Sequence, residues 1–318
     1  MKLLTGAEVR DLLDWPSTIE ALENIFRTAC ITPVRHHHNV PVSEGSDATM
    51  LLMPAWTSEF LGVKIANVFP GNGRCGLPAV MATYLLSCAR TGTPLALVDG
   101  GELTARRTAG ASALAAKYLA RKDAKRLLLV GTGRIAANLA HAHSAILPID
   151  DIRVWGRNSA NAEKLAATLR DEGLKAVAVG DLAEEVANAD IVSCATLSTT
   201  PLVLGEWLTE GTHLDLVGGF TPGMREADDE AIRCASVFVD TREGATAEAG
   251  DIITPLKSGV LKREDIRAEL GDFAFGRHAG RTNASEITLF KSVGASLEDL
   301  ATAILAYKRA VTREKDAA

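Results

Sequence analysis

A glycine-rich turn, Gly131-Thr132-Gly133-Arg134-Ile135-Ala136, follows the apolar run RLLLV and precedes a stretch whose apolar residues recur at helical spacing. In such a strand-turn-helix the first glycine makes the turn, and the second lets the backbone approach a pyrophosphate. The small third residue lets the helix pack on the strand, while the amino end of the helix faces the negative charge. The pattern predicts dinucleotide binding, although a glycine turn also occurs in other doubly wound folds.

The tip of the next expected strand reads VWGRN at residues 154–158. Domains that bind NAD usually place an acid about 20 residues beyond the glycine turn, where it holds the ribose 2′-hydroxyl. This tip has no acid, Gly156 leaves room, and Arg157 could bind a 2′-phosphate through charge-assisted hydrogen bonds. We therefore expect NADPH to be preferred over NADH. The alternative is that Arg157 is only a solvated charge at a strand end.

Three basic residues in the first third of the chain stand out by their setting. Lys64 lies in the apolar run GVKIANV, and Arg35 precedes three histidines, residues 36–38, in an expected loop. Arg107 lies about one turn into a helix expected over residues 103–120, where the helix dipole would add to its attraction for a carboxylate. From spacing alone, a surface charge is the preferred interpretation of each.

Other chemistries find little support in the sequence. Three adjacent histidines on an extended chain point alternately to opposite faces, so His36, His37 and His38 cannot all bind one ion. His141 and His143 lie on different faces of a helix, and we expect no acidic companions for them. Neither a G-x-S-x-G motif nor a catalytic-cysteine signature is present. We expect no metal site, which leaves hydride transfer as the chemistry.

From about residue 125 onward, short apolar runs alternate with alanine-rich segments of helical spacing. The runs are RLLLV, DIRVW, KAVAV, DIVSCA, HLDLV and SVFVD. This alternation is typical of βαβ units with a parallel sheet covered on both faces. Residues 113–295 are thus expected to form a doubly wound, Rossmann-type domain.

The beginning of the chain has a different pattern of apolar and polar residues. Two amphipathic helical stretches are expected near residues 5–13 and 17–29, followed by segments broken by glycine and proline. The sequence TGTP between apolar runs indicates a hairpin in an antiparallel sheet. The closing stretch SLEDLATAILAYKRA is an amphipathic helix. We expect an α/β protein, in which the Rossmann-type domain is inserted in an α+β domain of residues 1–112 plus 296–318.

Composition and charge limit the possible partners. The chain has 318 residues, 47% of them hydrophobic, and a formal net charge of -6, which is typical of soluble globular proteins and gives no general attraction to nucleic acid or membrane. The opening residues MKLLTGAEVRDLLDW lack the apolar stretch of a signal peptide. Five scattered cysteines are interpreted as reduced thiols, mostly in the core. We expect a cytoplasmic protein with a small-molecule partner.

Six stretches resemble, in the same order, the ornithine cyclodeaminase/μ-crystallin family. They are LGVKIANVFPGN, GLPAV, TGTPLALVDGGELTARRTAGASALAAKYLA, LLLVGTGRIA, ADIVSCAT and LFKSVGASLEDLA. The resemblance implies an NAD(P)-binding domain inserted in a domain that forms homodimers through its sheet. Members include ornithine cyclodeaminases, alanine dehydrogenases, ketimine reductases and Δ1-pyrroline-2-carboxylate reductases.

The resemblance also implies roles for single residues, and it reverses the preference for surface charges. Lys64 matches the active-site lysine of the family, and Arg107 matches the arginine that clamps the substrate carboxylate. Arg35 matches a second arginine that contacts the same carboxylate. The positions at which family members touch the cofactor correspond to Thr108, Gly131, Gly133, Arg134, Ile135, Arg157, Asn158, Thr196 and Val293.

One departure bears on the activity. Cyclodeaminases and related alanine dehydrogenases resemble each other at G-[GA]-D-x-P-G-K after the fifth strand, where the aspartate acts as a base or amine anchor. This chain reads GGFTPGM at residues 218–224, so Phe220 stands in place of the aspartate, and Asp228 and Asp229 lie beyond the loop. Phenylalanine can neither accept a proton nor hold an amine. The G-x-F-T-P variant looks like that of the cyclic ketimine reductases.

The sequence thus predicts NAD(P)H-dependent reduction of Δ1-pyrroline-2-carboxylate, and of Δ1-piperideine-2-carboxylate, to L-proline and L-pipecolate. Arg107 and Arg35 would hold the carboxylate, Lys64 would bind it or supply a proton, and Phe220 would line the substrate site. Two alternatives remain open at this point. One is an ornithine cyclodeaminase or amino-acid dehydrogenase of the same family, and the other is a non-enzymatic, crystallin-like protein that binds NADPH.

Overall fold

The computed structural model describes residues 1–43 and 47–316. The chain divides into two compact units. The first unit comprises residues 1–107 and 295–318, and the second comprises residues 108–294. One boundary falls inside helix α3 (Gly100–Leu119), five residues before the position expected from the sequence, and the other falls one residue before its expected position.

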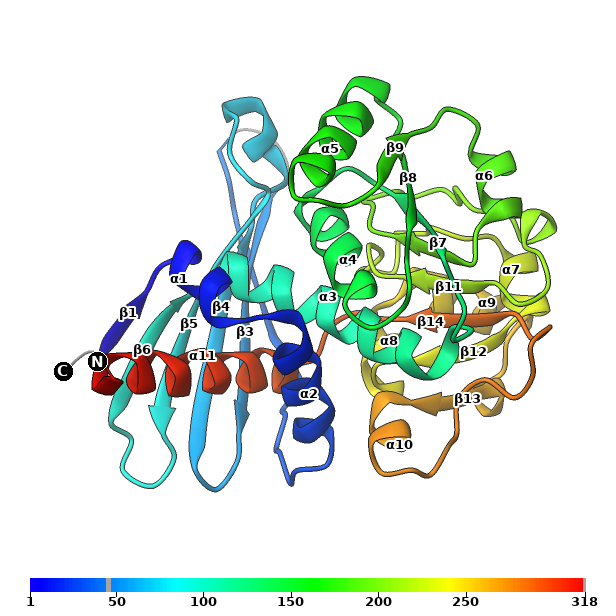
Figure 1. The fold of residues 1–318 in the computed structure, drawn as a ribbon. Coiled ribbons are helices and arrows are strands. Elements are labelled where there is room, and N and C mark those ends of the chain that lie inside the picture. Colours follow the sequence, from blue (N-terminus) through cyan, green and yellow to red (C-terminus); the bar gives the residue numbers. More distant parts are fainter. Residues whose placement is uncertain (44–46, 317–318) are drawn as a thin grey trace. The chain divides into compact units, whose positions relative to one another are not determined.

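The first unit is built on a six-stranded sheet (Figure 1). Its outer strand β1 pairs in parallel with β6, and the remaining neighbours are antiparallel. The expected hairpin at TGTP joins β5 to β6. In sheet order the strands are β1 (Lys2–Leu4), β6 (Pro94–Asp99), β5 (Val80–Cys88), β4 (Phe60–Val68), β3 (Ala48–Trp56) and β2 (His36–Val40).

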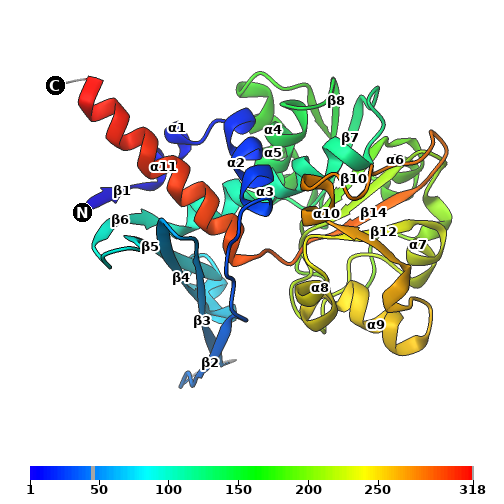
Figure 2. The same cartoon turned by 90° about the horizontal axis from the view of Figure 1, so that it is seen from below.

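Helices begin in this unit where the sequence supplies caps. The Thr5 side chain and Glu8 form a capping box at the start of α1 (Gly6–Leu12), and Asp14 caps α2 (Trp15–Phe26). Such caps satisfy backbone N–H groups that the first turn leaves without partners. The long C-terminal helix α11 (Ser296–Asp316) lies across one face of the sheet, against β3 to β6 (Figure 2).

The three adjacent histidines do not lie in a loop. His36, His37 and His38 belong to the edge strand β2, where they pair with Leu52, Leu51 and Met50 of β3. Their exposed side chains therefore alternate between the two faces of the sheet.

The second unit contains an eight-stranded parallel sheet, which confirms the expected Rossmann-type fold. The chain reverses its strand order between β7 and β10, and the carboxyl ends of strands at such a point are the usual ligand site. In sheet order the strands are β13 (Ile266–Glu269), β12 (Ser236–Val239), β14 (Thr288–Lys291), β11 (His213–Leu216), β10 (Ile191–Cys194), β7 (Arg126–Val130), β8 (Asp151–Trp155) and β9 (Ala176–Ala178).

Helices connect these strands. They are α4 (Arg134–Ser144), α5 (Ser159–Asp171), α6 (Leu182–Asn188), α7 (Asp229–Cys234), α8 (Arg242–Glu248), α9 (Gly250–Ser258) and α10 (Leu270–Ala274). Short 3-10 turns occur at Gly205–Trp207 and Arg263–Asp265 in this unit, and at Pro70–Cys75 in the first. Asp228, which lies beyond the 218–224 loop, caps α7 by accepting a hydrogen bond from the N–H of Ala231.

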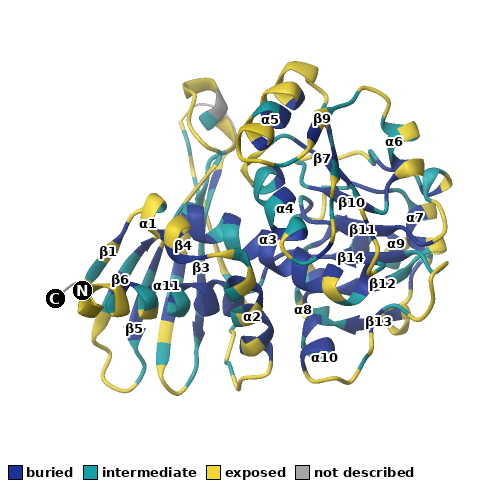
Figure 3. Ribbon diagram, in the orientation of Figure 1, coloured by how far each residue is buried: buried dark blue, intermediate teal, exposed yellow. Residues whose placement is uncertain are grey.

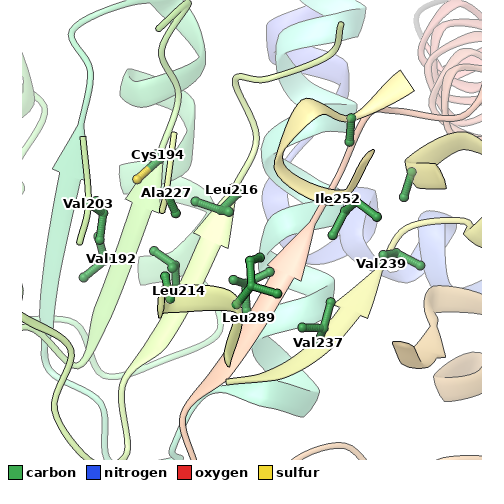
Figure 4. Close-up of a cluster of buried hydrophobic side chains, with 14 of the residues drawn as sticks. Val192, Cys194, Val203, Leu214, Leu216, Ala227, Val237, Val239, Ile252 and Leu289 are labelled. Carbon is green, nitrogen blue, oxygen red and sulfur yellow. The ribbon is translucent and has the colours of Figure 1, made fainter. Parts of the chain in front are cut away.

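The central strands of the second unit are buried along their whole length (Figure 3). Val192, Leu214, Leu289 and Val237 come from four different strands and pack in one apolar cluster (Figure 4). Strands buried on both faces are rich in apolar residues, although β11 (HLDL) and β14 (TLFK) also bury polar side chains. This core holds the carboxyl ends of the strands in fixed positions.

Two further expectations concern the cysteines and the apolar segments. All five cysteines are free, but only Cys194 is buried, while Cys75 and Cys234 are exposed. The expectation that most of them lie in the core is therefore wrong. Within residues 1–43 and 47–316, no helix combines the length and the apolar character needed to cross a membrane.

Candidate functional site

A buried ionic cluster lies between the sheet of the first unit and helix α11. Lys64 of β4 is 3% exposed, and its Nζ lies 2.7 Å from Oδ2 of Asp299. The Nε of Arg107 lies 3.0 Å from Oδ1 of the same carboxylate, and Nη1 lies 3.0 Å from Oε2 of Glu298. The sheet, α3 and α11 thus each supply charged groups to one cluster. The structure brings together Lys64 and Arg107, two of the residues predicted from the sequence.

The alternation of β4 explains why Lys64 points inward. Lys64 is in register with Met53 of β3 and Tyr84 of β5, and both of these side chains are buried. Neighbouring residues of β4 point to the other face, where Leu61 and Ile65 are exposed. A lysine on an inner sheet face requires a counter-ion, because an isolated buried charge is very costly. Asp299 supplies that counter-ion.

Burial lowers the pKa of Lys64 to about 8. The Asp299 carboxylate opposes this effect, whereas the positive charges of Arg107 and Arg35 add to it. A proton donor works best when its pKa lies near the working pH. Lys64 is therefore charged at neutral pH and can still release a proton.

Arg35 lies directly before β2 and is half-buried. Its charge reaches Lys64, since it contributes to the lowered pKa of that lysine. Three cations, Lys64, Arg107 and Arg35, accompany the two carboxylates of Glu298 and Asp299. Lys64 and Arg107, the two buried cations, share the Asp299 carboxylate, and cationic side chains of this kind can bind a ligand carboxylate.

Helix α3 begins at Gly100, so Arg107 lies about two turns into it. The expectation that Arg107 lies about one turn into the helix and benefits from the helix dipole is wrong, since that effect fades within one turn. Its burial and its orientation come instead from Glu298 and Asp299. These carboxylates hold the pKa of the guanidinium above its usual value against the effect of burial.

Sequence reasoning missed Glu298 and Asp299. Both are fully buried in the first turn of α11, within a stretch that is buried from Ser296 to Ala303. The signal was present, because two adjacent acids in the apolar part of a helix need buried cations as partners. The stretch was interpreted only as an amphipathic helix.

The glycine turn of the second unit has the geometry that dinucleotide binding requires. Gly131 adopts a φ of 128°, and a Cβ there would lie 2.6 Å from the carbonyl oxygen of Ala195. Gly133 caps α4 without a side-chain hydrogen bond, and a Cβ there would meet nothing within 4 Å. The N–H groups of the first turn of α4 are thus left open to an anion. The residues present fit the pyrophosphate of a dinucleotide.

A hollow of about 370 Å³ borders this turn. Its lining includes Thr132, Gly133, Arg134, Asn161, Lys164 and Thr168. The basic and hydroxyl side chains around a helix amino end favour a phosphorylated ligand. Asn161 and Lys164 were not predicted from the sequence.

Replacing Gly131 by alanine is expected to weaken dinucleotide binding by at least about tenfold and to destabilise the fold by about 1–3 kcal/mol, because a side chain adds strain at positive φ. NADH titration by fluorescence, together with urea unfolding, would measure both effects. Gly180→Ala is the matched control, since a Cβ at Gly180 meets nothing within 4 Å and its φ is not positive. Unchanged NADH affinity in Gly131→Ala would refute the role of this turn.

The tip of β8 leads directly to the glycine turn. A Cβ on Gly156 would lie 2.6 Å from Cγ2 of Thr132, so the glycine allows these two segments to approach. Arg157 is exposed, and Asn158 caps α5 by accepting hydrogen bonds from the N–H groups of Ala160 and Asn161. The Asn158 side chain thus shapes the local backbone, while Arg157 is free to face a ligand.

A second buried carboxylate organises the loops after β10 and β11. Glu226 accepts hydrogen bonds from the N–H and the hydroxyl of Thr196 at 2.7 and 2.8 Å. Its other oxygen accepts from the N–H groups of Gly218 and Gly219 at 2.7 and 3.3 Å. The predicted residue Thr196 is thus fixed beside the start of the loop that carries Phe220. A Cβ on Gly218 would lie 2.0 Å from the carbonyl oxygen of Thr196, so this approach requires glycine.

Glu226 belongs to a buried group with Asp251 and Lys291. The Nζ of Lys291 lies 3.0 Å from Oδ2 of Asp251 and 3.9 Å from Oε2 of Glu226, and all three residues are 0% exposed. Burial raises the pKa of Glu226 to about 7, against the opposing charge of Lys291. None of these three residues was predicted from the sequence. They hold the loops that carry Thr196 and Phe220.

The remaining predicted residues of the second unit lie on helices α3 and α4 and in the loops after β11 and β14. Thr108 is buried on α3, and Phe220 is half-buried after the two glycines. The backbone N–H of Val293 donates to Oδ2 of Asp240 at 2.7 Å, directly after β14. Ile135 follows Arg134 in the first turn of α4.

The two histidines of α4 do have acidic companions, contrary to expectation. The Nε2 of His141 lies 2.6 Å from Glu172, and that of His143 lies 3.6 Å from the buried carboxylate of Asp215. Asp215 also accepts hydrogen bonds from the hydroxyls of Ser112 and Ser193. Its carboxylate is therefore a hydrogen-bond acceptor for buried side chains beside the sheet. Within the part of the chain that the structure describes, no three His, Cys, Asp or Glu side chains are grouped as metal ligands.

Known proteins resemble this chain over nearly its whole length. The sequence model of the ornithine cyclodeaminase/mu-crystallin family matches residues 2–314. The chain belongs to this family. A Δ1-pyrroline-2-carboxylate reductase of Colwellia psychrerythraea is 37% identical, over 95% of this chain and 97% of its own length.

Solved structures of family members share the fold. The Δ1-pyrroline-2-carboxylate reductase of Thermococcus litoralis, in complex with NADH and L-proline, superposes with a TM-score of 0.94 at 38% identity, covering 99% of this chain and 98% of that one. An archaeal alanine dehydrogenase dimer with bound NAD has a TM-score of 0.90 at 31% identity, covering 99% and 97%. The family resemblance inferred from the six sequence stretches is confirmed.

Proposed function

We propose that this protein reduces Δ1-pyrroline-2-carboxylate to L-proline with a reduced nicotinamide dinucleotide. The observation that carries the proposal is the buried cluster in which Lys64 and Arg107 share the Asp299 carboxylate and the pKa of Lys64 is lowered to about 8. The reductases of Colwellia and Thermococcus, which resemble the chain over nearly its full length, support the substrate class. The chain is accordingly an oxidoreductase that acts on a C=N bond.

Arg107 and Arg35 bind the substrate carboxylate in this proposal. The Nε and Nη1 groups of Arg107 are already held by Asp299 and Glu298, so the guanidinium is oriented before the substrate arrives. Fixing a binding group in advance reduces the entropy lost when the reacting atoms are aligned. Arg107 remains charged despite its burial, because the two carboxylates raise its pKa.

Lys64 donates the proton that the reaction consumes. A bound reduced nicotinamide supplies a hydride to the imine carbon. The ring nitrogen takes a proton from the Lys64 ammonium, so that C=N becomes CH–NH and the lysine is left neutral. Solvent then returns a proton to the lysine. The pKa of about 8 makes this transfer feasible near neutral pH.

Phe220 lines the substrate site in this proposal. Its ring offers an apolar surface to a small cyclic imine and has no group that could hold or deprotonate a substrate amine. Cyclodeamination of ornithine needs such a group, so this residue favours reduction of a ready-made ring. We extend the substrate class to Δ1-piperideine-2-carboxylate, since one methylene changes binding by only ~1–3 kcal/mol.

Product analysis tests the assignment. Incubation with Δ1-pyrroline-2-carboxylate and NADPH is expected to yield L-proline in a 1:1 ratio to oxidised coenzyme, as measured by chiral chromatography. If folded protein forms no proline over the whole range from pH 6 to pH 9, the proposal is overturned.

Among nicotinamide coenzymes we propose a preference for NADPH. The solved relatives contain NADH or NAD, so this proposal rests on this chain's own β8 tip. Arg157 is exposed beside Gly156, and no carboxylate follows in the segment from Arg157 to Ala162. The contacts to the coenzyme are assigned to Thr108, Gly131, Gly133, Arg134, Ile135, Arg157, Asn158, Thr196 and Val293.

The Arg157→Ala variant is expected to raise the Kd of NADPH by about 10–100-fold, because hydrogen bonds to a charged group contribute ~1.5–3 kcal/mol. The Kd of NADH serves as the internal control and should change by less than about threefold. Parallel fluorescence titrations measure the two constants. An equal loss of affinity for both coenzymes would show that Arg157 does not recognise the 2′-phosphate.

We further propose a homodimer formed through the open face of the sheet in the first unit. Leu3, Leu97, Leu85, Val63 and Pro54 are in register across five strands on the face opposite Lys64. Leu61 and Ile65 beside them are 38% exposed, and Met81 is 50% exposed. A contiguous apolar surface of this kind marks a protein interface.

The free cysteines fit a reducing compartment, and we place the protein in the cytoplasm.

A further inference from the structure

We propose that Asp299 is a positioning residue that keeps Lys64 in its charged, proton-donating form and aligns it with Arg107. This inference rests on the proposed function, because it concerns the proton that imine reduction consumes. Asp299 does not touch the substrate in this account. It acts through the two cations that do.

The geometry places one carboxylate between two cations from different elements. Oδ1 of Asp299 accepts from Nε of Arg107 at 3.0 Å, and Oδ2 lies 2.7 Å from Nζ of Lys64. Asp299 is 0% exposed, so water does not screen these interactions. The carboxylate therefore fixes the distance between a residue of β4 and a residue of α3. A proton donor and a carboxylate clamp must be held at a fixed spacing to serve one small substrate.

The neighbouring acid has a different partner. Oε2 of Glu298 lies 3.0 Å from Nη1 of Arg107, on a different nitrogen of the guanidinium from the one that Asp299 contacts. Glu298 is equally buried and precedes Asp299 in the same helical turn. The two acids thus offer a matched pair. Removal of either charge affects Arg107, but the close ion pair with Lys64 belongs to Asp299.

The two arginines and the tyrosine around Lys64 do not favour its charged form, and the Glu298 carboxylate pairs with Arg107. Arg107 of α3 and Arg35, which precedes β2, are cations and lower the pKa of Lys64. Tyr84, opposite Lys64 on β5, stays neutral, because burial raises the pKa of its hydroxyl well above its usual value. Asp299 raises the pKa of Lys64 against burial, through its charge and through its hydrogen bond to the ammonium. Without Asp299, the pKa of Lys64 should fall below about 8.

The sign of the expected change follows directly. Reduction requires protonated Lys64, so kcat/KM falls as pH rises through the pKa of this lysine in the free enzyme. An opposite charge at this distance shifts a pKa by about 1–3 units. Removing the charge of Asp299 should therefore shift the alkaline limb of the plot of kcat/KM against pH to lower pH, by about 1–3 pH units. At pH values below the new pKa, where Lys64 is still protonated, the KM for the imino acid should not rise, since the cluster gains positive charge there.

The experiment compares Asp299→Asn with Glu298→Gln, using full-length protein and NADPH oxidation with Δ1-pyrroline-2-carboxylate from pH 5.5 to 10. We expect the limb near pH 8 to move below about 7 in Asp299→Asn, and to move by less than about 0.5 unit in Glu298→Gln. Asp299→Glu restores the charge and should return the limb toward pH 8. Asp299→Ser, which is smaller, undergoes the same test if the asparagine variant does not fold.

Three results would overturn the inference. An unchanged limb with uniformly lower activity in Asp299→Asn would show that the residue is only structural. Equal shifts in Asp299→Asn and Glu298→Gln would show that total charge matters and that the contact with Lys64 does not. Wild-type protein that fails to reduce the imine would overturn the proposed function together with this inference, whereas the first two results leave the proposed function intact.

Discussion

Replacing Lys64 by alanine is expected to lower kcat for imine reduction by about 10²–10⁴-fold, the usual contribution of a positioned proton donor. Lys64 is the buried lysine of the cluster, and its pKa of about 8 suits proton transfer near neutral pH. Alanine provides no proton, and Asp299 keeps Arg107 as a cationic partner. Steady-state NADPH oxidation at 340 nm measures the effect.

Lys64→Arg is the control that separates charge from proton transfer. Arginine keeps the ion pair with Asp299, but it does not release its proton, because the pKa of a guanidinium lies far above the working pH. We expect kcat of this variant to be close to that of Lys64→Ala, with thermal stability nearer to wild type. Wild-type kcat in either variant would remove Lys64 from the mechanism.

The second large effect concerns stability. Replacing Lys291 by methionine is expected to lower the free energy of unfolding by about 3–5 kcal/mol, because it leaves the buried carboxylates of Asp251 and Glu226 without their cation. Urea unfolding followed by circular dichroism measures the change. Coenzyme affinity should fall as well, since Glu226 holds the backbone of Thr196 and Gly218.

Lys257→Met is the matched control for this variant. Lys257 is an exposed lysine in the last turn of α9, the helix that also carries Asp251. Exposed substitutions of this kind change stability by less than about 0.5 kcal/mol. A loss below about 1 kcal/mol in Lys291→Met would mean that the buried group does not stabilise the second unit.

Much of the fold could be predicted because the local signals agree with it. Strands β7, β8, β10, β11 and β12 coincide with the short, mainly apolar runs of the sequence, and the glycine turn marks the connection from β7 to α4. Strand β14 was not predicted, although it lies in the middle of the sheet between β11 and β12. It has only four residues, TLFK, and ends in a lysine whose burial depends on acids far away in the sequence.

The site was predictable to the extent that the family motifs carry it. Lys64 and Arg107 were found through their sequence context, and the structure joins them through one carboxylate. That carboxylate, Asp299, is separated from Arg107 by 192 residues, so no local pattern connects them. The same holds for Glu226, which contacts Thr196 across a distance of 30 residues. Sequence spacing suggests which groups can react, whereas their partners become visible only in the folded chain.

The most direct test of the account compares two reactions of the same protein sample. NADPH oxidation with Δ1-pyrroline-2-carboxylate is measured at 340 nm, beside the release of ammonia from L-ornithine in the presence of NAD. We expect rapid oxidation with the imine and no ammonia from ornithine, because Phe220 cannot serve the substrate amine. Ammonia and proline from ornithine, without turnover of the imine, would contradict the assignment and show that another residue replaces the missing aspartate.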